Sequence, residues 1–131
     1  MLQIDVLSRV PVYEQIIDQI ETLIATGAMK AGYQLPSVRG LSVEILVNPN
    51  TIQKAYTELD NLGIVTSVPG RGCFVSQNAP EMLRRRGTES LGELYALAKR
   101  LYSLGVRAEE LHQTIDEAVS GKTADGTGKE G

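Results

Sequence analysis

Hydrophobic residues recur at helical spacing from residue 12 onward. Pro11 stands where a first helical residue belongs, and Gly27 follows the last apolar position. The pattern therefore predicts an amphipathic helix between them. Its apolar positions are Ile16, Ile17, Ile20, Leu23 and Ile24.

Two shorter helices are predicted next, separated by only a few residues. Ser37 is placed to cap the first, which carries Val38, Leu41, Ile45 and Leu46 and stops near Val47. Asn48 followed by Pro49 has the order of a cap and a first helical residue. This helix is expected to run to about Leu62, with Gly63 ending it.

A β-branched run then changes the pattern. Residues 64–68 and 73–75 read as two short strands joined by Pro69-Gly70-Arg71-Gly72. The order helix, helix, helix, hairpin is that of a winged helix-turn-helix, which we expect over residues 1–77.

The C-terminal part carries a different pattern. A stripe repeats every seven residues, and Leu97 and Leu104 widen it beyond what one solvated helix can bury. A shorter helix follows Gly105, so we expect a two-helix dimerisation region over residues 78–119. Residues 120–131 lack large apolar side chains and are expected to be disordered. The stripe residues are Leu91, Leu94, Tyr95, Ala98, Leu101 and Tyr102.

The third predicted helix has two distinct faces. On a helical wheel the apolar face consists of Ile52, Ala55, Tyr56, Leu59 and Leu62. The opposite face carries Asn50, Gln53, Lys54 and Thr57. Amide side chains can hydrogen-bond adenine edges and lysine can donate to guanine or phosphate, so this face is suited to reading a major groove. A merely solvated helix face is the alternative.

Further donors are expected around this face. Arg39 at the start of the second helix and Thr51 early in the third are placed to bind phosphates. Gly70-Arg71-Gly72 places a cation at the hairpin tip between two residues that allow a close backbone approach to DNA. Most acidic residues between positions 1 and 75 are expected to lie away from this presumed DNA-binding side.

Composition adds constraints. The 131 residues carry a net charge of −3, so any binding to nucleic acid must be local. A single cysteine and a single histidine are too few for a disulfide or an ordinary zinc site, and no metal or cofactor is expected. No signal peptide or long apolar run occurs, which favours a cytoplasmic protein without membrane contact.

These segments resemble the DNA-binding domain of the GntR family of bacterial transcription regulators. The resemblance spans residues 11–75, and the Val47-Asn48-Pro49-Asn50-Thr51 segment with the short helical tail is similar to the YtrA subfamily. The matching segments are Pro11-Val12-Tyr13-Glu14-Gln15-Ile16, Gly32, Leu35-Pro36-Ser37-Val38-Arg39, residues 47–56, Glu58-Leu59, Gly63, Gly70-Arg71-Gly72 and Phe74-Val75.

The resemblance implies a homodimeric, repressor-like protein that binds a double-stranded DNA operator. It also places Arg39, Thr51, Gln53 and the wing tip at positions that contact DNA in the family. Two departures stand out. Pro49 replaces the arginine of many relatives, which removes one contact, and Gly40 replaces a common glutamate, which predicts a slightly weaker helix start.

Other functions are weighed against this one. An enzyme would have to use His112 or Cys73, and neither has a plausible catalytic partner in the sequence, so no catalytic residue is assigned. A winged helix that serves as a protein-binding scaffold is the second alternative. The C-terminal stripe also suits a pocket for an unknown small-molecule effector between protomers, although packing is the commoner use of such a stripe.

Overall fold

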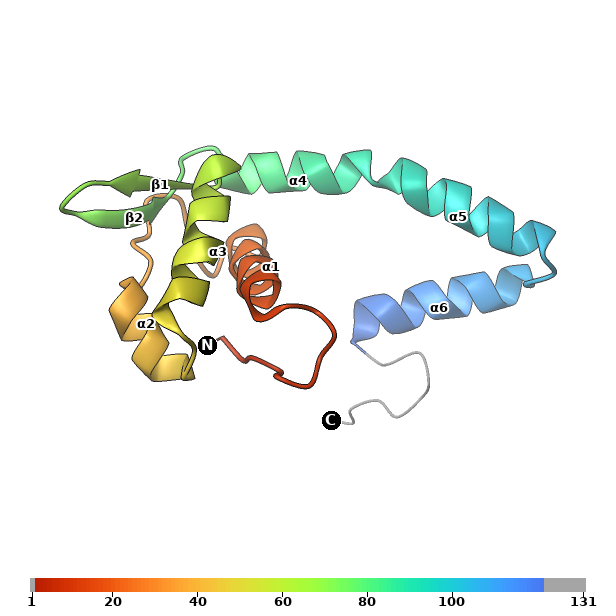
Figure 1. Cartoon of the computed structure of the whole chain (residues 1–131). Coiled ribbons are helices and arrows are strands. Elements are labelled where there is room, and N and C mark those ends of the chain that lie inside the picture. The colour runs from red at the N-terminus through yellow and green to blue at the C-terminus, as the bar shows by residue number, and fades with distance from the viewer. Residues whose placement is uncertain (1, 122–131) are drawn as a thin grey trace. The chain divides into compact units, whose positions relative to one another are not determined.

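A computed structural model of the chain describes residues 2–121 and has the predicted order of three helices and a hairpin, followed by further helices (Figure 1). Contacts divide the chain into an N-terminal unit, Met1–Gly87, and a C-terminal unit, Thr88–Gly131. The N-terminal unit thus runs past the boundary predicted at residue 77. Of the tail predicted to be disordered, residues 122–131 lie outside the described part of the chain.

The first helix, α1, spans Val12–Ala25. The prediction that Pro11 is its first helical residue is wrong, because Pro11 has an extended ψ of 147° and occupies the N-cap position. The helix buries Ile16, Ile17, Ile20 and Ile24, as its spacing predicts. Its end is followed by Gly27 at a φ of +88°.

The helix-turn-helix consists of α2, Val38–Ile45, and α3, Pro49–Asn61. Both predicted caps are confirmed, since Ser37 Oγ accepts a hydrogen bond from the Gly40 N–H and Asn48 Oδ1 accepts one from the Asn50 N–H. Pro49 is at the first position of α3, where its missing N–H leaves no hydrogen bond unmade. The turn between the helices passes through Leu46 in a left-handed conformation, with a φ of 58°.

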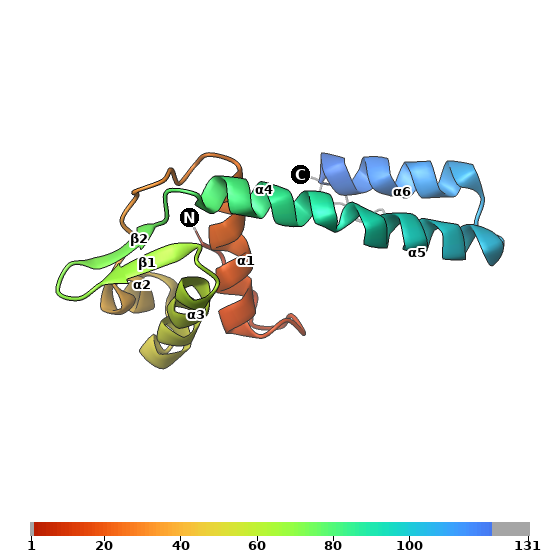
Figure 2. The same cartoon turned by 90° about the horizontal axis from the view of Figure 1, so that it is seen from above.

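The hairpin pairs β1, Val65–Val68, with β2, Gly72–Val75, in antiparallel register. Val65 lies opposite Val75, and Val68 lies opposite Gly72 at the tip. On its other edge β2 forms an isolated bridge between Phe74 and Gln34. The turn of the hairpin projects away from α1 and α3 (Figure 1, Figure 2), and this is the wing of the predicted fold.

A single hydrophobic core lies between α1, α2, α3 and the hairpin. The predicted apolar face of α3 is confirmed at its first four positions, but Leu62 is 43% exposed and does not belong to the core. Leu62 is the C-cap residue of α3, so it lies where the helix ends. The buried cluster consists of Leu2, Ile16, Ile17, Ile20, Ile24, Met29, Leu35, Leu41, Ile52, Ala55, Tyr56, Leu59, Ile64, Val65, Val75 and Ala79.

A helix that the hydrophobic pattern did not single out follows the hairpin. This helix, α4, spans Ala79–Glu89 and buries only Ala79 fully. Met82 and Leu83 are half-buried against the core, and Arg86 bonds to Glu21 of α1 across 2.9 Å. Its other positions are mostly polar, so no sustained apolar stripe marks it in the sequence.

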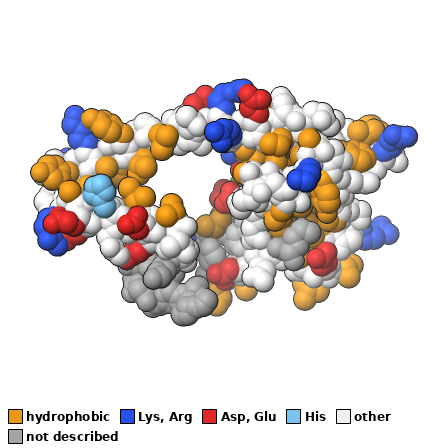
Figure 3. Space-filling model, turned by 180° about the vertical axis from the view of Figure 1, so that it is seen from behind, with side chains coloured by type: hydrophobic (Ala, Val, Ile, Leu, Met, Phe, Trp, Pro, Cys, Tyr) orange, Lys and Arg blue, Asp and Glu red, His pale blue; other side chains and the backbone are white. Residues whose placement is uncertain are grey.

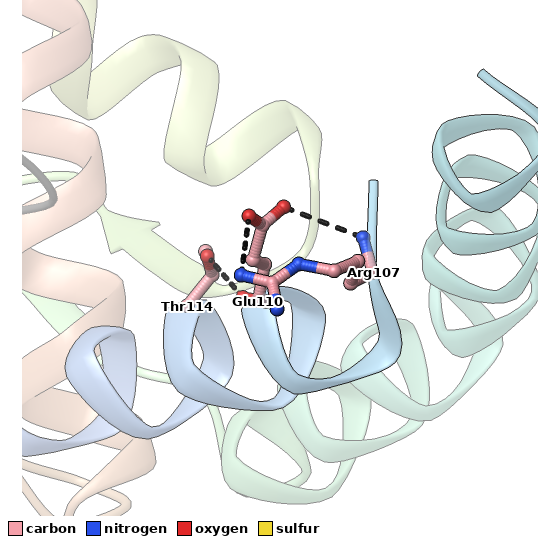
Figure 4. Close-up of polar contacts among 3 residues, drawn as sticks. All are labelled: Arg107, Glu110 and Thr114. Atoms are coloured by element: carbon pink, nitrogen blue, oxygen red, sulfur yellow. Dashed lines mark hydrogen bonds and ion pairs between the residues drawn. The ribbon is translucent and has the colours of Figure 1, made fainter. Parts of the chain in front are cut away.

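The C-terminal unit contains α5, Leu91–Ser103, and α6, Ala108–Ser120, which runs in the opposite direction to α5 (Figure 1). The start of α6 is held by Glu110, whose carboxylate accepts hydrogen bonds from the backbone N–H and the guanidinium of Arg107 (Figure 4). One turn on, Thr114 Oγ1 donates to the Glu110 carbonyl at 2.8 Å (Figure 4). Local polar contacts therefore define this helix.

Hydrophobic side chains gather on the surface of the C-terminal unit (Figure 3). Neither α5 nor α6 has a fully buried residue. Of the predicted stripe, Ala98 and Leu101 are half-buried and the remaining members are exposed. The large exposed apolar residues of the two helices and their connecting turn are Leu91, Leu94, Tyr95, Leu97, Tyr102, Leu104, Ile115 and Val119.

Within residues 2–121, no helix combines the length and the apolar character that crossing a lipid bilayer requires.

Candidate nucleic-acid interface

The predicted reading face of α3 is exposed as a whole. Asn50, Gln53, Lys54 and Thr57 all lie on the solvent side, while Thr51 is half-buried. They are held there because Ile52, Ala55, Tyr56 and Leu59 anchor the opposite side of the helix in the core. The helix therefore presents amides, a hydroxyl and a cation on one surface, which are the groups that hydrogen-bond base edges.

Side chains of this face already contact protein groups. Gln53 Nε2 donates to Thr57 Oγ1 at 3.1 Å. Lys54 Nζ lies 4.0 Å from the ring centroid of Tyr13 on α1, a cation–π contact. Both contacts are on the surface and are weak enough to be exchanged for contacts with a ligand. The contact between Tyr13 and Lys54 has no signal in the sequence, because no local pattern relates α1 to α3.

Tyr13 remains protonated at ordinary pH. Its hydroxyl donates to Glu14 Oε2 at 3.4 Å, and the nearby negative charge of Glu14 raises the pKa of Tyr13. The ring is thus a neutral platform beneath the Lys54 ammonium.

The start of α2 carries Arg39, one of the residues predicted to bind phosphate. Arg39 is exposed on the first turn, two residues after the Ser37 cap. The slightly weaker helix start expected from Gly40 stays a prediction, and a Cβ at that position would lie 2.9 Å from Ser37 Oγ. Glycine thus gives up the carboxylate of a capping box but leaves room for the serine cap.

The wing tip is a tight turn that requires glycine. The Arg71 N–H donates to the Val68 carbonyl at 2.9 Å, and Gly70 has a φ of +78°. Proline followed by a residue of positive φ is the sequence of a type II turn, so Pro69 and Gly70 define its shape. The Arg71 side chain is exposed beyond it, as predicted.

An open groove of about 410 Å³ joins these parts. Its lining comes from residues 34–38, which lead into α2 and begin with Gln34, from Gln53 and Tyr56 of α3, and from the wing between Ser67 and Cys73. The structure thus brings Gln53 together with Gly70, Arg71 and Gly72. Arg39, Asn50, Thr51, Lys54 and Thr57 lie outside this lining.

Charge is unevenly distributed over the N-terminal unit. The lining of the wing groove carries one cation, Arg71, and no carboxylate. A separate groove of about 330 Å³ is lined by Glu14, Asp18, Glu21 and Glu58 together with Arg86. The predicted local asymmetry is therefore present for these residues, and a polyanion is favoured at the wing groove over the acidic one.

Tyr56 and Cys73, which line the groove, have contacts and pKa shifts that point to structural roles. Tyr56 is buried, and its hydroxyl donates to the Pro36 carbonyl at 2.8 Å. Burial strongly raises the pKa of Tyr56, so it remains a donor that ties α3 to the segment before α2. Burial also raises the pKa of the Cys73 thiol, which disfavours the reactive thiolate.

No grouping of three or more potential metal-ligating residues occurs among residues 2–121.

Comparison with known proteins identifies a matching family and a similar curated protein. The family described as "Bacterial regulatory proteins, gntR family" matches residues 12–75. The HTH-type transcriptional repressor YtrA of Bacillus subtilis is 44% identical over 118 residues, which cover 89% of this chain and 91% of that protein.

Two solved structures are also similar. A GntR family transcriptional regulator from Listeria monocytogenes is 33% identical, with a TM-score of 0.68 over 84% of this chain and 96% of that one. AraR(DBD) in complex with operator ORX1 is 28% identical, with a TM-score of 0.51 over 56% of this chain and 98% of that one.

Proposed function

This chain belongs to the GntR family of bacterial regulatory proteins, and from that premise we propose that it is a homodimeric repressor of a palindromic operator. It is a DNA-binding transcription regulator, and the resemblance to the YtrA subfamily is confirmed. The relatives are named as regulators, which agrees with the prediction that the chain is not an enzyme.

One observation supports the proposed mode of binding above the others: Gln53 of the exposed polar face of α3 and the wing carrying Arg71 line one groove without carboxylates. In this mode α3 enters the major groove, and Asn50, Gln53, Lys54 and Thr57 face the bases. Gln53 exchanges its contact with Thr57, and Lys54 leaves the Tyr13 ring, when the bases arrive.

Contacts to the DNA backbone fix the register of α3. Arg39 at the start of α2 and Thr51 early in α3 bind phosphates, since both lie at helix N-termini where backbone N–H groups favour anions. Arg71 reaches the adjacent minor groove of the DNA. Its neighbours Gly70 and Gly72 have no side chains, which allows the wing backbone to approach closely.

The C-terminal unit supplies the surface that pairs with a second copy of the chain. Its stripe of Leu91, Leu94, Tyr95, Ala98, Leu101 and Tyr102 has no fully buried member within one chain. A second protomer would bury these side chains in a two-fold interface. A two-fold dimer presents two equivalent α3 helices, and this geometry requires a palindromic operator with half-sites about one helical turn apart.

Repression follows if the bound dimer blocks RNA polymerase. The protein then acts in the bacterial cytoplasm, where its DNA lies. A small-molecule effector remains part of the proposal only as a ligand of the C-terminal stripe between protomers. A protein-binding scaffold without specific DNA binding is the competing function, and it gives no reason for Arg39, Lys54 and Arg71 to flank one reading surface.

Selection from a random duplex DNA library, repeated at two salt concentrations, tests the proposal. A two-fold symmetric motif that is enriched at both concentrations is expected, because base contacts persist when phosphate contacts are screened. Failure of the folded dimer to enrich any motif would favour the scaffold. An enriched motif without two-fold symmetry would retain DNA binding and overturn the palindromic operator.

A further inference from the structure

The wing tip extends beyond the backbone hydrogen bonds that hold the hairpin to the N-terminal unit. The segment before α2 pairs with β2 through three bonds of 2.8 Å: Gly32 N–H to Val75 O, Val75 N–H to Tyr33 O, and Leu35 N–H to Cys73 O. These backbone hydrogen bonds support β2 only as far as Cys73. A hairpin of two four-residue strands is marginal by itself, so the tip needs another support.

One side chain continues this support to the tip. Gln34 Nε2 donates to the Arg71 carbonyl at 2.8 Å, across a sequence separation of 37 residues. The amide therefore reaches the residue whose side chain the proposed function places on DNA.

Gly72 makes the contact possible. A Cβ at position 72 would lie 2.6 Å from Gln34 Nε2, too close for the two to coexist. Gly72 also has a φ of +127°, which side chains rarely allow. The missing side chain leaves the space in which the amide sits, so Gln34 and Gly72 fit each other.

We propose that Gln34 is a positioning residue for Arg71: by holding the Arg71 carbonyl it fixes the wing tip and thereby aims the arginine at DNA. The inference rests on the proposed function, because it assumes that Arg71 contacts the operator. No local sequence pattern singles out Gln34 for this role. Gln34 acts through Arg71 and makes no contact with DNA of its own.

The variant Gln34→Met tests the idea in the full-length protein. Methionine has similar length but no N–H donor, and position 34 is exposed, so the fold is expected to be retained. Loss of one neutral hydrogen bond is expected to weaken operator binding roughly 3- to 10-fold. The matched control Gln77→Met, at the end of the hairpin far from the tip, is expected to bind like the unaltered protein.

Two readouts separate positioning from other roles. Hydrogen exchange of the Arg71 amide, measured without DNA, is expected to speed up several-fold in Gln34→Met but not in the control. In an Arg71→Ala background, the same substitution is expected to change operator affinity less than about twofold, because its effect passes through Arg71.

The outcomes are distinguishable. Unchanged Arg71 exchange, or unchanged operator affinity, in Gln34→Met would overturn the positioning role alone. Fully additive losses in the double variant would show that Gln34 binds DNA directly, which also overturns it. Failure of the unaltered protein to bind any selected motif would overturn both this inference and the proposed function.

Discussion

The two units of this chain solve the problem of burying apolar residues in opposite ways. The N-terminal unit places its large aliphatic residues in one core, with Ile16, Ile52, Leu59 and Ile64 fully inaccessible to solvent. The C-terminal unit has comparable residues on α5 and α6 but buries none of them fully, and Tyr95 remains 69% exposed. The first unit has a buried core of its own, whereas the second leaves its large apolar side chains exposed within one chain.

This difference explains a division of labour. The N-terminal unit can hold α3 and the wing in a fixed arrangement using only its own side chains. In the proposed dimer a second copy covers the stripe, so the fold of the C-terminal unit and its association with that copy are expected to be coupled. Substitutions in the N-terminal unit are therefore expected to affect DNA contacts, and substitutions in the C-terminal unit are expected to affect dimer formation.

The strongest test targets the stripe. Leu94→Glu combined with Leu101→Glu places carboxylates on the apolar face, and the protein is expected to become monomeric in analytical ultracentrifugation. Operator affinity is expected to fall about 10²- to 10⁴-fold, because the second half-site no longer benefits from a high effective concentration.

Ser103→Glu with Gln113→Glu is the matched control, since it adds the same number of carboxylates at exposed polar positions of the same unit. It is expected to leave the dimer intact. A leucine double variant that stays dimeric would place the interface elsewhere.

The core of the N-terminal unit gives the next largest effect. Ile52→Ala is expected to lower the free energy of unfolding by about 2–5 kcal/mol, because Ile52 is fully buried and a cavity remains. Chemical denaturation followed by circular dichroism measures this. Val43→Ala, at a position that is 71% exposed, is the control and is expected to change stability by less than about 0.5 kcal/mol. Equal effects of both substitutions would contradict the assignment of the core.

A smaller effect is expected at high pH. Tyr56 has its pKa raised above the ordinary value of 10.0 by burial, so above that pH the unfolded chain loses a proton that the folded chain keeps. The unfolded state is then favoured, and stability present below pH 10 is lost as the pH rises. Between pH 9 and pH 11 the loss is expected to be about 1 kcal/mol larger than in Tyr56→Phe, measured by denaturant unfolding. Parallel pH profiles for the two proteins would rule out this contribution.

The smallest effect separates DNA contact from assembly. Arg71→Ala is expected to weaken binding to all DNA sequences and to reduce the salt dependence by about one unit of slope, while the dimer persists. Titrations at several salt concentrations measure the slope. Lys30→Ala removes an exposed cation that does not line the wing groove and is expected to leave the slope unchanged. A variant at Arg71 with an unaltered slope would remove the wing from the DNA contacts.

Local sequence signals predicted the parts of the fold that depend on neighbouring residues. The caps at Ser37 and Asn48 and the glycine turn at the wing were all expected from residues a few positions apart. Two predictions were wrong at the ends of helices, where spacing alone does not define the first or the last helical residue. Pro11 precedes α1 instead of beginning it, and Leu62 lies at the end of α3, where it escapes the core.

The candidate site divides in the same way. Periodicity alone placed Asn50, Gln53, Lys54 and Thr57 on one face of α3, because helix geometry relates residues within a few turns. The contact of Lys54 with Tyr13 and that of Gln34 with Arg71 join residues far apart in the chain. No periodic pattern reports such pairs, since they exist only after the core has brought the elements together.

By itself, the sequence determined the order of the elements, their caps and their apolar faces, because each depends on spacing, side-chain type and backbone freedom within a short stretch. Only the tertiary structure decided that α4 begins within the N-terminal unit, that the wing is supported by the segment before α2, and that Gln34 reaches the carbonyl of Arg71. These arrangements depend on long-range packing, because the buried core fixes the distance between segments that are far apart in the sequence.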